Sequence, residues 1–144
     1  MGLRPTDLAP LGSNGPTVQT PPAKEHITKT FQVARTDTTA AVKAVLPASS
    51  SIIDIRIFGP ASNAGTTATL GLGTTSAANQ ILSAQDVKTA GGLIRPTTAV
   101  QSTGFLAFEP VPWAGDIQLW AQYAETGAVS SAGGPWIVQV DYIP

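Results

Sequence analysis

Residues 51–58 read Ser-Ile-Ile-Asp-Ile-Arg-Ile-Phe, the clearest period-two pattern in the chain. Successive side chains of a β-strand point to opposite faces of its sheet, so this alternation predicts a strand with one buried face. We expect Asp54 and Arg56 on the solvent side of the strand. The buried side is then formed by three isoleucines, Ile53, Ile55 and Ile57.

Other short runs of period two recur from His26 onward, separated by clusters of Gly, Pro, Ser and Asn that are typical of turns. Because the loop at residues 59–65 is rich in turn formers, we expect a hairpin there. The predicted inward residues are Ile27, Phe31 and Val33; Ala68, Leu70 and Leu72; Ile117, Leu119, Ala121 and Tyr123; and Trp136, Val138, Val140 and Tyr142.

Two further segments complete the predicted domain. Residues 76–87 contain good helix formers in a window too short for a stable isolated helix, which predicts one helical turn or a loop. Residues 101–108 form a candidate strand that ends before Pro110 and Pro112, because proline cannot donate to a β-ladder. Together the runs predict an all-β domain over residues 26–144, a β-sandwich or jelly roll of about six to eight short antiparallel strands.

The first 25 residues differ from the rest, because their prolines and glycines disfavour both a helix and a central strand. Residues 1–25 are therefore expected to form an extended N-terminal arm. Such an arm can bind a neighbouring subunit or fold back over its own domain, and the sequence leaves both readings open. The candidate interface residues of the arm are Leu3, Arg4, Leu8, Leu11 and Val18.

The composition narrows the classes of partner. Charged residues make up only 12% of the 144 residues, and the formal net charge of -1 gives little repulsion between copies. The basic residues form no stripe that could neutralise phosphates or anionic lipids, so neither nucleic acid nor a membrane is an expected partner. The chain has no cysteine, which excludes disulfides and thiolate nucleophiles. Its first residues lack the apolar run of a signal peptide, which favours synthesis in the cytoplasm.

Few residues could carry catalysis, so we expect no enzyme activity, no cofactor and no metal site. The single histidine, His26, lies beside Glu25 where the arm meets the first strand, and a Ser-His-Asp triad would need it. The carboxylates are isolated in sequence, which favours solvated strand faces and turn caps over a calcium site built from loops. Those considered are Asp54, Asp86, Asp116, Glu125 and Asp141.

Residues 71–75, Gly-Leu-Gly-Thr-Thr, resemble a phosphate-binding loop only in their glycines, because the lysine and third glycine are missing. We interpret them as a strand end followed by a turn. Small residues also let another backbone approach closely, which suits packing between subunits.

The tryptophans are candidates for contact with a partner. Parity along residues 117–123 places Trp120 outside, on the face of Gln118 and Gln122. An exposed tryptophan is usually covered, here by a neighbouring subunit, by the chain's own arm or by a sugar ring stacked on the indole. Trp113 lies in a predicted loop and is a second interface candidate, whereas Trp136 is expected in the core.

Several segments resemble those of small virion proteins encoded near tailed-phage capsid genes. They are Leu46-Pro-Ala-Ser, the alternating strand after it, Asn63-Ala-Gly-Thr-Thr-Ala-Thr-Leu, Gly71-Leu-Gly-Thr-Thr, Asp86-Val-Lys-Thr-Ala-Gly and the closing Trp136-Ile-Val-Gln-Val-Asp-Tyr-Ile. The resemblance is to the head decoration, or cement, proteins of tailed bacteriophages. It implies a β-sandwich that binds the capsid exterior, bridges capsomers and is commonly trimeric, with no catalytic residues.

The resemblance also implies the partners and the location of this chain. The partners are the major capsid protein and further copies of this chain, and the location is the outside of a virion. We expect the chain itself to be made in the host cytoplasm. The alternative reading is a receptor- or carbohydrate-binding head-fibre, tail or neck component of a phage virion. In that case the exposed tryptophans would bind sugar.

Overall fold

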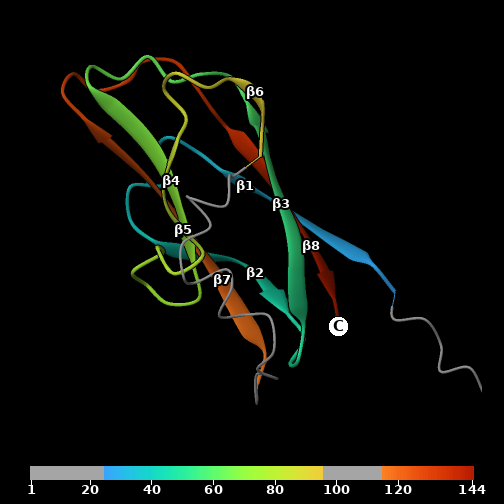
Figure 1. Cartoon of the computed structure of the whole chain (residues 1–144). Helices are drawn as coiled ribbons and strands as arrows, with labels where there is room; N and C mark the ends of the chain where they lie inside the picture. The colour runs from blue at the N-terminus through green and yellow to red at the C-terminus, as the bar shows by residue number, and fades with distance from the viewer. Residues whose placement is uncertain (1–24, 96–114) are drawn as a thin grey trace, which may run out of the picture.

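The structure, a computed structural model, describes residues 25–95 and 115–144, and these residues form two β-sheets packed face to face (Figure 1). The strands are β1 (Ile27–Val33), β2 (Ala41–Leu46), β3 (Ser51–Gly59), β4 (Thr67–Gly73), β5 (Leu82–Asp86), β6 (Gly92–Ile94), β7 (Ile117–Thr126) and β8 (Trp136–Ile143).

Sheet A has the strand order β1-β8-β3-β6 and sheet B has the order β2-β7-β4-β5. All neighbouring strands in both sheets are antiparallel. Figure 1 views the two layers edge-on, with β4, β5 and β7 on the left and β3 and β8 on the right. The predicted all-β sandwich of short antiparallel strands is therefore confirmed.

The core lies between the sheets and is built from the alternating residues that the sequence pattern singles out. Burying apolar side chains from both sheets supplies the main favourable term in folding. Outside β3, Ile27 is the one predicted inward residue that is only partly buried, and it packs against the core. The rest are buried as predicted: Phe31, Val33, Ala68, Leu70, Leu72, Ile117, Leu119, Ala121, Tyr123, Trp136, Val138, Val140 and Tyr142.

Strand β3 departs from its predicted pattern near its start. Its register against β8 shifts between Ile52 and Asp54, which is a β-bulge. The extra residue turns Ile52 into the core and leaves Ile53 exposed, so the prediction that Ile53 is buried is wrong. Beyond the bulge, Ile55 and Ile57 are buried as predicted.

Two connections also differ from their predicted form. β3 and β4 lie in opposite sheets, so the loop between them crosses from one layer to the other and does not close a hairpin. The segment predicted as a helical turn or a loop, residues 76–87, contains strand β5, which pairs with β4. Ile81, Leu82 and Val87 are buried there, and this tertiary burial outweighs the weak helix propensity of the segment.

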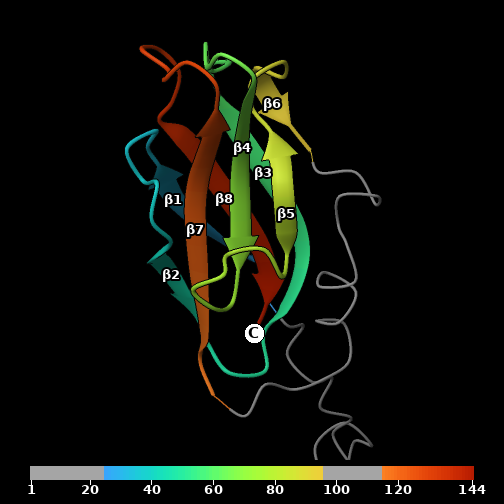
Figure 2. The same cartoon turned by 90° about the vertical axis from the view of Figure 1, so that its left-hand side faces the viewer.

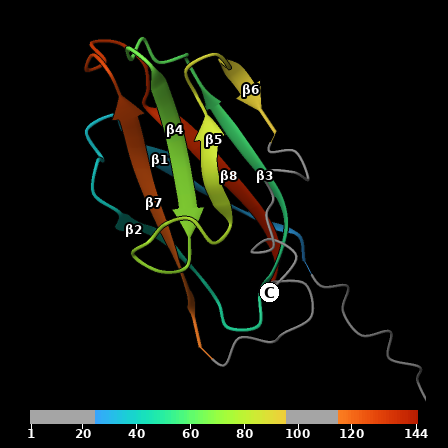
Figure 3. The same ribbon diagram turned by 60° about the vertical axis from the view of Figure 1, so that its left-hand side comes forward.

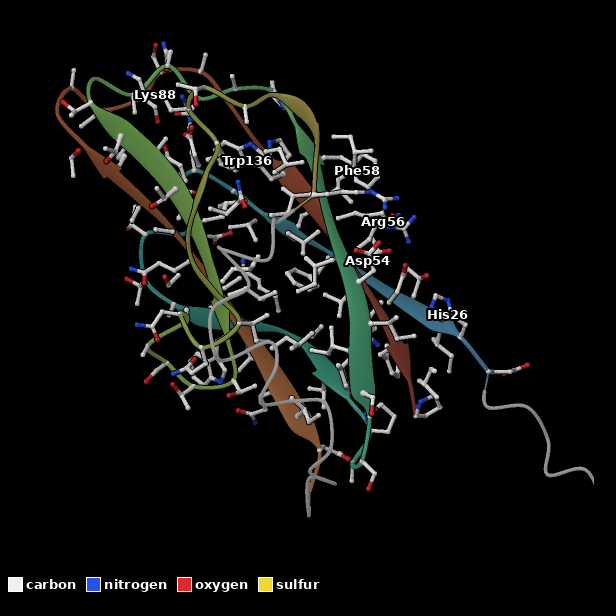
Figure 4. The ribbon with its side chains drawn as sticks, viewed as in Figure 1. His26, Asp54, Arg56, Phe58, Lys88 and Trp136 are labelled. Carbon is white, nitrogen blue, oxygen red and sulfur yellow. The ribbon has the colours of Figure 1, made fainter. Side chains whose placement is uncertain are left out.

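The loops that join β3 to β4 and β7 to β8 are tied together at one end of the sandwich. The backbone N–H of Gly65 donates to the carbonyl oxygen of Ala128 over 2.8 Å. A Cβ at Gly65 would collide with the backbone nitrogen of Ala128. The ammonium group of Lys88, at the same end in Figure 4, donates to the carbonyl oxygens of Ala64 and Gly65 over 2.6 and 3.0 Å. The paths of these loops are therefore fixed by contacts that leave no room for a side chain at Gly65.

Beneath these loops an aromatic pair fills the space between the sheets. The rings of Tyr123 and Trp136 stack with centroids 5.1 Å apart and planes inclined by 18°. Figure 4 shows Trp136 between the two layers, and its indole N–H donates to the carbonyl oxygen of Pro60 over 3.0 Å. The predicted core position of Trp136 is confirmed, since its side chain is fully buried.

The hydroxyl of Tyr123 joins a polar network that makes stability sensitive to acid. It donates to the Glu125 carboxylate over 2.6 Å and lies 2.9 Å from Ser62 Oγ, while Ser130 N–H donates to the same carboxylate. Hydrogen bonds from Ser130, and then from Tyr123, hold the pKa of Glu125 below its ordinary value of 4.5. Ionised Glu125 therefore stabilises the folded state.

Because the folded pKa of Glu125 is depressed, its contribution is complete above the unfolded pKa and is lost as the pH falls through the folded pKa. We expect the free energy of unfolding to decrease as the pH falls below the ordinary pKa of 4.5 and through the lower folded pKa, and the Glu125→Gln variant to show a shallower decrease. Denaturant titrations over this range measure both slopes. Equal slopes for the two proteins would contradict the assignment to Glu125.

Candidate functional site

One of the seven residues predicted at subunit interfaces, Trp120, lies within the described residues. Apart from Glu25, the predicted arm lies outside them, and so does the candidate strand at residues 101–108. So do the other predicted interface residues, Leu3, Arg4, Leu8, Leu11, Val18 and Trp113. His26 is exposed directly before β1 (Figure 4), as expected for a residue at the start of the first strand.

Trp120 lies on the outward face of sheet B, which Figure 2 views from the front. It is half-buried on β7, and its cross-strand neighbours are Val42 on β2 and Gly73 on β4. The predicted orientation of Trp120 is confirmed. We define the Trp120 face as five outward residues of two adjacent strands, Val42, Val45, Gln118, Trp120 and Gln122.

The centre of this face carries no charge. No outward position of β2, β7 or β4 holds an ionisable side chain, and Lys43, in the bulge of β2, pairs with Asp37 over 2.7 Å. Val42 and Val45 are exposed. Depletion of charge around an aromatic residue is typical of the core of a protein–protein interface.

The loop between β4 and β5 covers the neighbouring part of sheet B, as Figures 2 and 3 show. A Cβ at Gly71 would collide with the carbonyl oxygen of Ala78, and a Cβ at Gly73 would lie 2.8 Å from Asn79 N. The strand end and turn predicted at residues 71–75 are confirmed. The close approach expected there from another subunit is instead made by the chain's own loop, which only glycine on β4 can accommodate.

The outward face of sheet A carries a second apolar cluster. Phe58 on β3 is paired directly with Leu93 on β6 and with Ile137 on β8, so the three side chains form a row across three strands. Leu93 is 54% exposed and Ile137 is 37% exposed. Figure 4 shows Phe58, Arg56 and Asp54 along β3 on the side away from sheet B. We call this outward surface of sheet A the Phe58 face.

An ionic network lies beside the apolar row. Asp141 points outward on β8 yet is only 5% exposed, because Arg56 and Thr28 both donate hydrogen bonds to its carboxylate. Asp54 lies 3.8 Å from Arg56 Nε and 3.9 Å from the guanidinium of Arg95. Two cations and two anions therefore balance, and Arg56 Nε is buried without a hydrogen-bond partner.

Asp86 and Asp116 fit the predicted roles, whereas Asp141 does not. Asp86 caps a turn, as predicted, by accepting hydrogen bonds from the backbone of Lys88 and Thr89, and Asp116 accepts one from Ala48 N. Asp141 was predicted on a solvated strand face, and the structure corrects this. Parity marks it as outward, but sequence order does not show that β1 and β3 flank β8 with Thr28 and Arg56.

Among the residues that the structure describes, no three His, Cys, Asp or Glu side chains are grouped so that they could hold a metal ion. No helix of residues 25–95 or 115–144 is long and apolar enough to span a bilayer.

The chain matches no protein-family model and no curated protein sequence. Among solved structures it is similar to a chain described as "Cyanophage Pam1 capsid asymmetric unit", with a TM-score of 0.54 and 20% sequence identity. The match covers 82% of this chain and 81% of that chain. At this level of identity, the likeness shows that the two chains share a fold.

Proposed function

We propose that this chain is a structural protein of a phage virion that binds the outer surface of the capsid and links neighbouring capsomers. The observation that carries the proposal is the fold shared with the cyanophage Pam1 capsid chain over about four fifths of both chains. The sequence resemblance to decoration proteins supports the same role independently, because it rests on segments of this chain alone.

The Trp120 face is the surface proposed to contact the capsid protein. Its outward residues can be covered without desolvating a charge, which is the main cost of burying a polar surface. Trp120 supplies the large aromatic side chain that typically dominates the energy of an interface. Gln118 and Gln122 beside it can hydrogen-bond to a partner's backbone.

The proposed mechanism is linkage. A protein that binds the assembled shell but not its dissociated subunits stabilises the shell by mass action. Many copies on one lattice hold neighbouring capsomers together even where each contact is weak. The homotrimer implied by the resemblance is not required by this mechanism and stays an alternative to pairs of chains. Contacts made by the predicted arm also stay a prediction.

A second candidate function is carbohydrate binding by a head-fibre, tail or neck component. The observation that favours it is a shallow hollow of about 160 Å³ beside the Trp120 face. Polar side chains of Thr69, Asn79, Ser83 and Gln122 line this hollow. A sugar ring there would place hydroxyl groups on these side chains. This reading predicts glycan binding that Trp120→Ala weakens while capsid binding persists.

Variants of the Trp120 face test the capsid proposal. We expect Trp120→Ala and Val45→Asp to lower the affinity for decoration-free capsids at least tenfold, the loss expected for a central interface residue. Val129→Asp is the matched control, because Val129 is 82% exposed in the loop after β7, away from this face. Co-sedimentation with capsids measures the affinities. Unchanged binding by both variants would contradict the assignment of this face.

A further inference from the structure

The Phe58 face is left unpartnered by the described residues. Its apolar row, Phe58, Leu93 and Ile137, is exposed in part, and the described loops do not cover it as the loop after β4 covers part of sheet B. Exposed apolar rows flanked by polar groups mark sites of association. The charges beside this row, described below, suit a second copy of the same face.

The edges of the two sheets are poor sites for association, so we expect a contact between molecules to use a sheet face. Edge strand β1 carries Lys29 at an inward position opposite Val140, and inward charges at an edge oppose pairing with a further strand. Edge strands β2 and β5 are interrupted by bulges, and β6 has only three residues. Within the described residues, each sheet edge thus has a feature that disfavours extension of the sheet.

The charges of the Phe58 face suit a copy of the same face. Arg56 and Arg95 are balanced by Asp54 and Asp141, so two such faces meet without net repulsion. These charges are already paired within one chain, which reduces the cost of removing them from water. A two-fold contact must be self-complementary, and the same row of Phe58, Leu93 and Ile137 would be offered by both partners.

The area of the Phe58 face indicates how strong a contact between two copies of it can be. Four strands about 4.8 Å apart and about seven residues long give a sheet face of roughly 450 Å². Two such faces bury roughly 900 Å² in total, below the range of about 1,200 to 2,000 Å² of stable complexes. The contact is therefore expected to be weak in dilute solution and to become populated where copies are concentrated.

We propose that the Phe58 face is a self-association surface, through which two copies of this chain bind across a two-fold axis. The inference does not depend on the proposed capsid function, and a two-fold contact produces pairs of chains, unlike the trimer implied by the resemblance. The surface uses sheet A, so it leaves the Trp120 face on sheet B free for another partner.

Sedimentation of the full chain between about 10 μM and about 1 mM tests the proposal, because weak interfaces of this size associate in that range. The weight-average mass is expected to rise from that of one chain towards that of two. Leu93→Asp and Ile137→Lys, which introduce opposite charges at two exposed positions of the row, should each raise the dissociation constant at least tenfold. Val45→Asp and Val129→Asp, which change apolar residues elsewhere, should associate like the unaltered chain.

The results of these experiments test the self-association surface independently of the proposed capsid function. A mass of one chain at every concentration overturns the self-association surface, and so does association that neither Leu93→Asp nor Ile137→Lys weakens. Unchanged thermal unfolding of the variants confirms that they fold. Capsid binding by Leu93→Asp at a low protein concentration tests the Trp120 face alone, so either proposal can fail without the other.

Discussion

Replacing Trp136 with alanine is expected to lower the free energy of unfolding by about 4 kcal/mol, within the range for removing a buried aromatic side chain. Trp136 is fully buried and stacks on Tyr123. Its removal leaves a cavity between the sheets, and the carbonyl oxygen of Pro60 loses its donor. Gly59 packs so closely that a Cβ there would lie 2.6 Å from the indole. Because the end of β3 is packed this tightly, we expect the surrounding residues to move little into the cavity, so the loss of stability stays large.

Urea titrations of Trp136→Ala and of the matched control Trp120→Ala measure this effect. Trp120 is half-buried on the outward side of β7, so its substitution should cost about 1 kcal/mol. Replacing tryptophan with alanine should therefore cost much more stability in the core than on the outward face of sheet B. Equal losses of stability in the two variants would contradict the assignment of Trp136 to the core and Trp120 to a surface.

Arg56→Met is expected to lower the free energy of unfolding by about 2 to 3 kcal/mol, because it leaves the Asp141 carboxylate buried without its cation. Thr28 still donates one hydrogen bond to Asp141, and the Arg56 side chain is 27% exposed, so the loss is expected at or just below the lower end of the range for breaking a buried pair, about 3 kcal/mol. The outward position of this pair makes it an unusual place for a buried charge. Denaturant unfolding at low protein concentration measures the loss without self-association.

Two companion variants sharpen this test. Arg95→Met removes a 63% exposed cation whose guanidinium is 3.9 Å from Asp54, and it should cost at most about 0.5 kcal/mol. Adding Asp141→Asn to Arg56→Met should recover part of the stability, because the buried group is then neutral. Similar losses for Arg56→Met and Arg95→Met, or no recovery in the double variant, would show that Asp141 does not depend on Arg56.

The faces of the strands were predictable because one physical rule, burial on alternate sides, governs most of them. It correctly placed Leu119 and Tyr123 in the core and Trp120 outside. The rule fails where a β-bulge adds one residue to a strand, as at Ile53. The bulge changes which residues face the core, and no pattern of apolar and polar residues in the sequence marks its position. It also fails at β5, where polar and helix-forming residues belong to a strand only because Leu82 packs into the core.

The candidate surfaces were predictable only in part. Trp120 was identified from parity alone, but the Phe58 face was missed because its residues come from strands that are distant in sequence. Nothing in the residues near Phe58 indicates that β6 and β8 flank it with Leu93 and Ile137. Strand order depends on long-range pairing, which a local pattern does not encode.

The rigid core and the two outward faces of the sandwich both bear on the proposed function. A tightly packed interior around Trp136 gives a rigid sandwich, and rigid faces lose little conformational entropy when they bind. The Trp120 face and the Phe58 face lie on opposite sheets, so two partners could be held at once. The proposed linkage of capsomers requires contact with more than one partner, and two separate faces allow this.

The most direct test of the central claim is to mix the purified 144-residue chain with capsids that lack decoration, and to measure co-sedimentation and the temperature at which the capsids break. We predict saturable binding and capsids that survive to a higher temperature, because a ligand of the assembled shell stabilises it. A chain that remains in the supernatant at every concentration, with an unchanged breakage temperature, would contradict the proposed function.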